Sequence, residues 1–146
     1  MEALDKADRN ACFEIRIRVF CEEQGVSRHL ELDGQDDHCR HFLALGNSGA
    51  GSPGLPVGTA RMRPLGDGVA KLERIAVLPH YRGQSVGRLL VEQTIAAAID
   101  DGHLRATMHA QSQAKPFYEK LGFIQTGPAF MEAGMPHVRM DRALTP

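Results

Sequence analysis

The turn that follows Leu78 has the residue types and spacing of an anion site. Pro79 stops a run of alternating apolar residues from continuing as a strand, and Gly83 permits a tight reversal into an apolar helix pattern. The backbone N–H groups of residues 83–88 are then unpaired donors of the first helical turn. Such donors, at the positive end of a helix dipole, bind phosphate. Two arginines flank the turn and could add charge-assisted contacts, Arg82 and Arg88.

An ordinary strand–helix turn with two solvated arginines is an alternative interpretation of this spacing. Two better-known phosphate loops are excluded: Arg88 stands after Gly87 where GxxxxGK[ST] needs lysine, and Gly83 and Gly87 do not make GxGxxG. Serine is among the best residues for the position just before a helix. We therefore expect the Ser85 hydroxyl to cap the helix or to bond the phosphate.

Hydrophobic periodicity predicts a mixed α/β chain whose first half is largely antiparallel. Residues 1–4 leave room only for a first strand that is very short or missing, and residues 26–37 predict a loop or short irregular helix beside a cleft. The glycine-rich stretch 47–56 predicts a hairpin connection, and Gly66-Asp67-Gly68 predicts a turn. We expect helices over 5–25, 85–102 and 114–122, and strands over 38–46, 57–65, 69–78, 104–110, 123–128 and 137–144.

The composition is that of one small domain without a strong overall charge. The chain has 146 residues, 24% of them charged, and a net charge of −1, so we expect a single domain over residues 1–146 and no affinity for nucleic acid or acidic membranes. Its three cysteines, without a CxxC pair or a signal peptide, favour the cytoplasm. No apolar run is long enough to span a membrane.

Three stretches resemble, in chain order, the motifs of one enzyme family. "LERIAVLPHYRGQSVGRLLVEQ" is similar to the acetyl-CoA signature of the GNAT superfamily of N-acetyltransferases, Arg/Gln-x-x-Gly-x-Gly/Ala, with Ser85 at the first glycine. "HAQSQAKPFYEKLGF" resembles a later block, in which a helix carries a tyrosine before LGF, and "RIRVFCEEQG" resembles R-x-x-VF-x-x-EQ of an ElaA/YjcF-like branch. The resemblance implies an α/β fold, the GNAT acyl-CoA N-acyltransferase fold, with a mixed, mostly antiparallel sheet, a splayed parallel strand pair and about four helices.

The resemblance also implies where acetyl-CoA, as a co-substrate, binds. The strand before the turn splays from the next parallel strand, and the pantetheine arm enters the gap to pair with exposed backbone. The pyrophosphate lies against the amides after Gly83. Carried over by position, the cofactor-binding residues are Ile75, Ala76, Val77, Arg82, Gly83, Gln84, Ser85, Val86, Gly87, Arg88, Gln111 and Phe117.

The implied chemistry is direct transfer: an amine attacks the thioester carbonyl, a tetrahedral oxyanion forms and a thiolate leaves. A protonated amine must first lose its proton, and Glu73 is the candidate base, with a cross-strand ion pair to Arg61 or Arg63 as its alternative role. Tyr118 matches the family tyrosine that protonates the leaving thiolate, although its helical spacing also fits a core residue. The Val77 amide is a candidate oxyanion donor.

The acceptor side carries a weaker signal. The resemblance places the first helix and its exit beside the acceptor cleft, which gives five candidate substrate-binding residues: Arg16, Glu22, Glu23, Gln24 and His109. Asp33, Asp36 and Asp37 add acidity that would suit a cationic amine, and a solvated charged loop is the alternative. No metal is expected, because His38 and His41 of "DDHCRH" would face opposite sides of a strand.

These features together predict an enzyme, an N-acetyltransferase that transfers the acetyl group of acetyl-CoA to a primary amine of a small molecule or peptide. The alternative is a non-catalytic acyl-CoA-binding or regulatory module. Dimers are common in this family, with the last strands as the expected contact, and the sequence leaves open whether this chain is a monomer or a homodimer.

Overall fold

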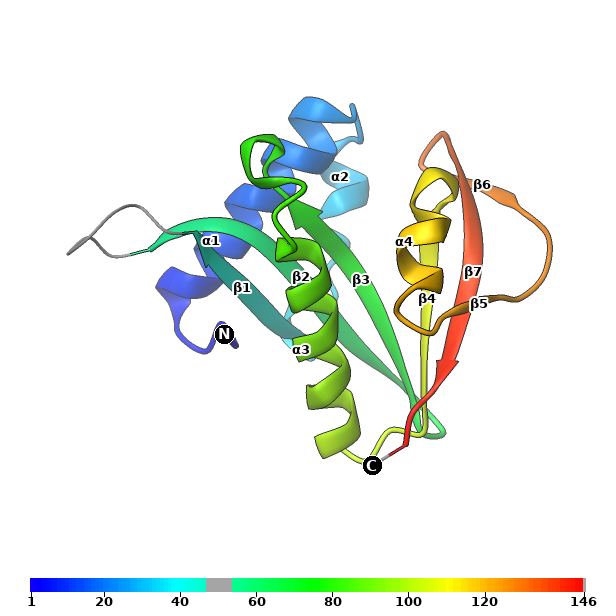
Figure 1. Ribbon diagram of the computed structural model, residues 1–146. Helices are drawn as coiled ribbons and strands as arrows, with labels where there is room; N and C mark the ends of the chain where they lie inside the picture. Colours follow the sequence, from blue (N-terminus) through cyan, green and yellow to red (C-terminus); the bar gives the residue numbers. More distant parts are fainter. Residues whose placement is uncertain (47–53, 146) are drawn as a thin grey trace.

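The computed structural model describes residues 1–46 and 54–145, and one mixed β-sheet forms its centre (Figure 1). Its strands run in the order β1-β2-β3-β4-β7-β5, with β6 also paired to β7. Only β3 and β4 are parallel among these described pairs, which confirms the predicted mixed, mostly antiparallel sheet. The helices are α1 (Lys6–Arg16), α2 (Arg28–Glu31), α3 (Val86–Asp100) and α4 (Lys115–Glu119). The strands are β1 (Arg40–Gly46), β2 (Leu55–Gly66), β3 (Val69–Val77), β4 (Arg105–Gln111), β5 (Ile124–Gln125), β6 (Phe130–Glu132) and β7 (Met135–Ala143).

Most predicted elements are confirmed, and the differences have local causes. Residues 66–68 form the predicted turn, with positive φ at all three positions. The helix expected over 5–25 changes character, because α1 continues as a π-helix over Ile17–Glu23 before Gly25 (φ +75°) ends it. The first strand is reduced to one bridge between Glu2 and Phe42. The predicted hairpin connection lies largely outside the described residues, and β6 was not predicted.

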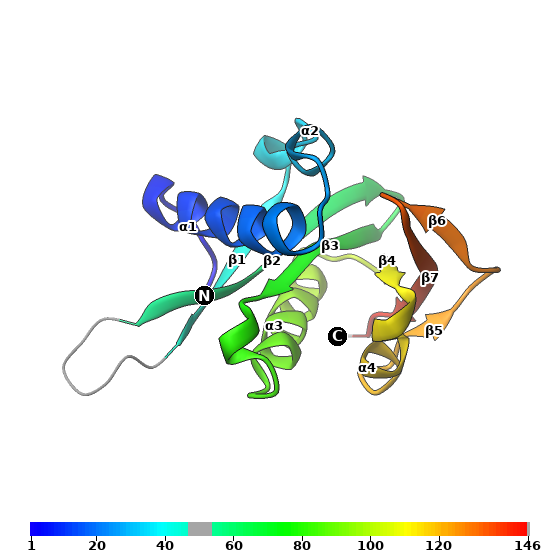
Figure 2. The same ribbon diagram turned by 90° about the horizontal axis from the view of Figure 1, so that it is seen from above.

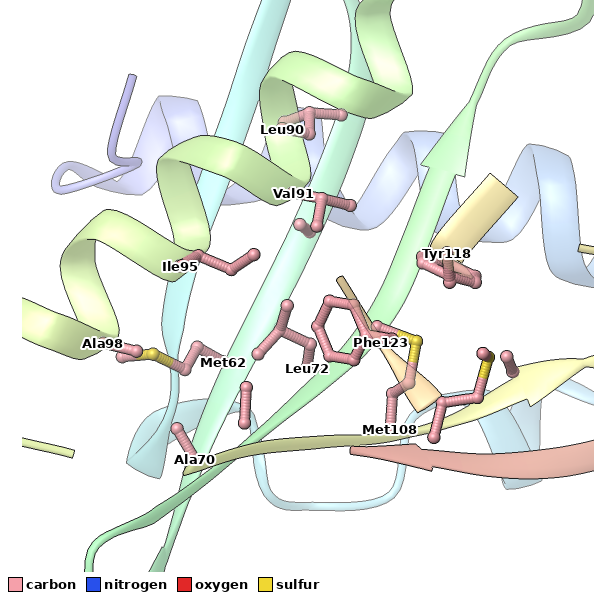
Figure 3. Packing of buried hydrophobic residues seen from close by; sticks show 14 of the residues in the cluster. Met62, Ala70, Leu72, Leu90, Val91, Ile95, Ala98, Met108, Tyr118 and Phe123 are labelled. Atoms are coloured by element: carbon pink, nitrogen blue, oxygen red, sulfur yellow. The ribbon is translucent and has the colours of Figure 1, made fainter. Parts of the chain in front are cut away.

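The two faces of the sheet differ in chemistry. Figure 2 shows α1 and α2 on one face and α3 and α4 on the other. Side chains alternate along a strand, so Met62, Leu72 and Met108 point to the α3 face, where they pack with Leu90 and other residues of that helix (Figure 3). The opposite face of the same strands carries charged side chains that form ion pairs. No helix of the described residues is long and apolar enough to cross a membrane.

Buried ion pairs attach the segment around α2 to the charged face. Arg16 of α1, fully buried, contacts Glu31 and Asp36 at 2.7 Å each. Arg61 of β2, also buried, contacts Asp36 and Asp33 at 2.9 Å each. A buried charge is tolerated only when it is paired, so these arginines fix the segment against the sheet.

The buried network yields a stability prediction. Replacing Arg61 with Met leaves the carboxylates of Asp33 and Asp36 without a shared cation, and removing one partner of a buried ion pair costs about 3–5 kcal/mol. We expect the free energy of unfolding, measured in urea, to fall by that amount. The exposed Arg18, changed to Met as a control, should alter it by no more than about 0.5 kcal/mol. Equal losses in the two variants would contradict the structural role of the network.

Candidate acetyl-CoA and acceptor cavity

The separation of β3 from β4 opens a gap in the sheet. Pairing between the two strands covers only Val69–Lys71 and Arg105–Thr107, and beyond these residues the strands diverge (Figure 1). The predicted splayed parallel pair is therefore confirmed. A cavity of about 780 Å³ occupies the gap and is lined from both strands and both faces of the sheet. Along this edge of β3 the backbone groups beyond Lys71 have no strand partner among residues 1–46 and 54–145.

A β-bulge marks the point where β3 leaves β4. Arg74 has φ +54°, unusual for a residue other than glycine, and the register with β2 shifts there, since Glu73 pairs with Arg61 but Ala76 with Thr59. One extra residue reverses the alternation of side chains. Leu72, before the bulge, packs on the α3 side, whereas Ala76 packs with the α1 cluster.

The bulge also decides which side chains and backbone groups reach the open edge. Ile75 and Val77 turn toward the α3 side, where they pack against the main core. The Leu78 N–H donates to Val57 O of β2 at 2.8 Å, so the N–H of the preceding Val77 points to the other edge, into the gap. This is the geometry that the predicted oxyanion donor requires.

The turn between β3 and α3 keeps the predicted free amides but uses Ser85 differently. A 3-10 helix over Pro79–Tyr81 leads to Gly83 (φ +80°) and Ser85 (φ +65°), and α3 begins at Val86. Ser85 makes no side-chain cap hydrogen bond, so the predicted N-cap is wrong: a capping residue has extended backbone, whereas this one is left-handed. The family glycine at this position suits that conformation.

Both arginines of the turn contact carboxylates. The Arg82 guanidinium donates to both oxygens of Glu23 at 2.7 Å, and its Nε donates to Val77 O at 2.9 Å. Arg88 donates to Glu92 at 3.2 Å, one helical turn away. These side chains are well exposed, so breaking the ion pairs to contact another group costs little free energy.

Tyr118 is both a core residue and part of the cavity wall. It is buried against the rings of Phe117 and Phe123, and it also lines the cavity. Burial raises the pKa of its hydroxyl well above the usual value, so the phenol is protonated at neutral pH. Within residues 1–46 and 54–145 the hydroxyl has no hydrogen-bond partner, which leaves its proton available to a bound group.

Glu73 lines the cavity, but its carboxylate is occupied. One oxygen accepts from Arg63 at 2.8 Å, the other accepts from Arg61, and Lys71 lies 3.4 Å away. Burial alone raises the pKa of Glu73, yet the hydrogen bonds from these arginines outweigh it and hold the pKa below its usual value. The alternative cross-strand role is confirmed, and a carboxylate so held is a weak base.

The predicted acceptor residues separate into two groups. Gln24 and His109 line the cavity, and Gln111 Nε2 donates to Gln24 Oε1 at 2.9 Å across the gap between β4 and the π-helix. Arg16, Glu22 and Glu23 do not line it. Arg16 is buried in the ion network because its position on α1 faces the sheet, and Glu23 is bound to Arg82. Of the cofactor residues, only the Gln84 side chain lies outside the lining.

The acidic loop does not present free acidity to the cavity. Hydrogen bonds from Arg61 lower the pKa of Asp33 strongly. Burial raises the pKa of Asp36, but hydrogen bonds from Arg16 outweigh this effect and lower it. Both carboxylates are therefore ionised and paired. Asp37 is exposed and lies outside the cavity lining. His38 lies in a 3-10 helix rather than on a strand. Within residues 1–46 and 54–145, no three side chains of His, Cys, Asp or Glu lie close enough together to bind a metal ion.

Sequence reasoning named His109 but missed its two partners in the cavity lining, Glu132 and His137. His109 Nδ1 lies 2.9 Å from Glu132 Oε1, and His137 Nε2 lies 3.8 Å from the other oxygen. The Phe130 ring contacts both imidazoles. The turn residues Ala133 and Gly134 were the signal that could have found this hairpin, because they bring β6 beside β7.

Comparisons with known proteins agree with this geometry. Residues 21–144 match the family described as acetyltransferase (GNAT) domain. The chain is 36% identical over 129 residues to the uncharacterized N-acetyltransferase YjcF of Bacillus subtilis, covering 88% of this chain and 87% of YjcF.

Solved structures show the same fold. Escherichia coli ElaA superposes with a TM-score of 0.81 at 25% identity, covering 95% of this chain and 92% of ElaA. An aminoglycoside 6'-N-acetyltransferase complexed with coenzyme A superposes with a TM-score of 0.74 at 14% identity, covering 97% and 93%. The open strand edge, the free amides of the turn and the sequence match lead to one conclusion: this chain belongs to the GNAT acetyltransferase family, in the ElaA/YjcF-like branch.

Proposed function

We propose that this protein transfers the acetyl group of acetyl-CoA directly to a primary amine of a small molecule or peptide. The observation that carries the proposal is one cavity that joins an open strand edge, the unpaired amides of a helix start and a protonated tyrosine. In the proposed reaction the amine nitrogen bonds to the thioester carbon, the C–S bond breaks, and the thiolate leaves with the proton of Tyr118. The Val77 N–H stabilises the oxyanion.

The cofactor is proposed to lie through the gap from the turn to the thioester site. The pantetheine arm pairs with the backbone of Ile75–Val77, and the pyrophosphate accepts from the amides of residues 84–88 and from the Ser85 hydroxyl. Arg82 leaves Glu23 and Val77 O to reach the pyrophosphate, which frees that carbonyl for the arm. A Cβ added at Gly87 would lie 3.4 Å from the Phe117 ring. The glycine therefore leaves space between the start of α3 and this ring at the turn end of the cavity.

We assign the amine proton to His109 rather than to Glu73. Glu73 is held by three cations. The one hydrogen bond of the His109 ring to the described residues joins Nδ1 to Glu132, which leaves Nε2 free. A carboxylate on one imidazole nitrogen fixes the tautomer and orients the ring for proton transfer at the other. His109 then receives the proton directly or through one water.

Binding of acetyl-CoA tests the cofactor site. Isothermal titration calorimetry should show saturable binding, and Arg82→Ala should weaken it about tenfold, since a charge-assisted hydrogen bond is worth ~1.5–3 kcal/mol and part is offset by the lost Glu23 pair. Arg18→Ala serves as the matched control and should bind as the parent protein does. An absence of any heat of binding would refute both the enzyme and the non-catalytic alternative.

Release of free thiol tests the role of Tyr118. Tyr118→Phe keeps the ring packing but removes the donor, and we expect kcat to fall ~10²-fold or more while acetyl-CoA affinity stays unchanged. Undiminished thiol release would remove the acid role. If the parent protein binds acetyl-CoA but releases no thiol with any amine tried, the non-catalytic module becomes the better account.

Chemical rescue tests His109. His109→Ala should lower thiol release ~10²-fold or more, and added imidazole should restore part of the rate because it can occupy the vacated space and accept the proton. Imidazole should not restore Tyr118→Phe. The exposed His38, changed to Ala, is the control and should keep full activity. Loss of activity without rescue would assign His109 to packing.

A further inference from the structure

A second groove lies next to the cavity, on the face of the sheet that α1 leaves uncovered. It has a volume of about 380 Å³ and runs across β2, β3, β4 and β7. Three residues line both the groove and the cavity, Arg63, Lys71 and His109, so the two spaces adjoin there.

The groove is cationic. Four of its lining side chains carry positive charge, Arg63, Lys71, Arg105 and Arg139, and among the described residues that line it Asp67 alone is a carboxylate. Arg63 and Lys71 contact Glu73, and Arg139 contacts Asp141 at 3.0 Å, but Arg105 makes no ion pair with any residue of 1–46 or 54–145. A concave surface with an excess of positive charge concentrates anions.

One carboxylate of the cavity lining, Glu132, is bound to His109, and the others near the acceptor end belong to a network in which cations outnumber them. Glu31, Asp33, Asp36 and Glu73 are shared among five cations in one connected network: Arg16, Arg61, Arg63, Lys71 and Arg74. An ammonium ion entering this site therefore finds no unpaired carboxylate of that network. Nearby like charges lower the pKa of an entering amine, which favours the neutral, nucleophilic form.

From this charge distribution we infer that the acceptor is a small amine that also carries an anionic group, a carboxylate or a phosphate. The amine lies by His109 and the thioester, and the anionic group lies in the groove against Arg105 and Arg139. This inference rests on the proposed acetyl transfer and names the substrate class of the same site.

Matched amines test the inference in the thiol-release assay. O-phosphoethanolamine is compared with ethanolamine, and γ-aminobutyrate with butylamine, so that the two pairs distinguish a phosphate from a carboxylate. At least one anionic amine should exceed its neutral counterpart in kcat/KM by about tenfold, and salt should reduce the difference. Arg105→Ala should reduce that ratio about fivefold or more, mainly through KM, whereas Arg18→Ala should not change it.

The outcomes separate this inference from the proposed function. Acetylation with ratios near one, unaffected by Arg105→Ala, overturns the anionic acceptor and leaves the acetyl transfer intact. If no amine releases thiol, the proposed transfer fails, and a binding measurement tests whether the groove is an anion site. O-phosphoethanolamine and γ-aminobutyrate are each titrated into the protein saturated with coenzyme A. Saturable binding that Arg105→Ala weakens supports an anion site, and no binding of either at millimolar concentration overturns it.

Discussion

The divergence of β3 from β4 is the constraint on which the rest of the structure depends. Parallel strands normally continue their hydrogen bonds, but here pairing ends after three residue pairs. Backbone groups left without a partner are costly unless something else bonds them, which makes the open edge suited to a ligand with its own amide groups. The bulge at Arg74 makes the divergence compatible with packing, because it turns Ile75 and Val77 toward the core that lines the gap.

The two faces of the sheet give the two ends of the cavity different chemistry. On the α3 side, apolar packing surrounds Tyr118 and keeps its phenol protonated. On the α1 side, buried arginines hold the segment around α2 and occupy the carboxylates near the opening. The network that stabilises the fold therefore also leaves none of its own carboxylates unpaired at this end of the cavity.

Much of this arrangement could be predicted from sequence because local chemistry determines it. Period-two and helical patterns gave the strands and long helices, and the positive-φ glycines Gly25, Gly83 and Gly102 gave their ends. The motifs in family order gave the turn, the open edge and Tyr118. The burial of Arg16 could not be predicted, because it depends on Glu31 and Asp36, which only the fold brings beside it. For Glu73 the sequence left two roles open, and the contacts with Arg61 and Arg63 on β2 establish the cross-strand one. The left-handed backbone of Ser85 and the short β6 strand were missed although local signals existed: the family glycine at position 85, and the turn residues Ala133 and Gly134.

The central claim is that the gap between β3 and β4 holds the acyl carrier. The most direct measurement is a crystal structure of the protein with coenzyme A. The account predicts the pantetheine arm hydrogen-bonded to the edge of Ile75–Val77, the pyrophosphate on the amides after Gly83, and Arg82 turned away from Glu23. Coenzyme A bound elsewhere, with the gap closed or filled by protein side chains, would contradict it.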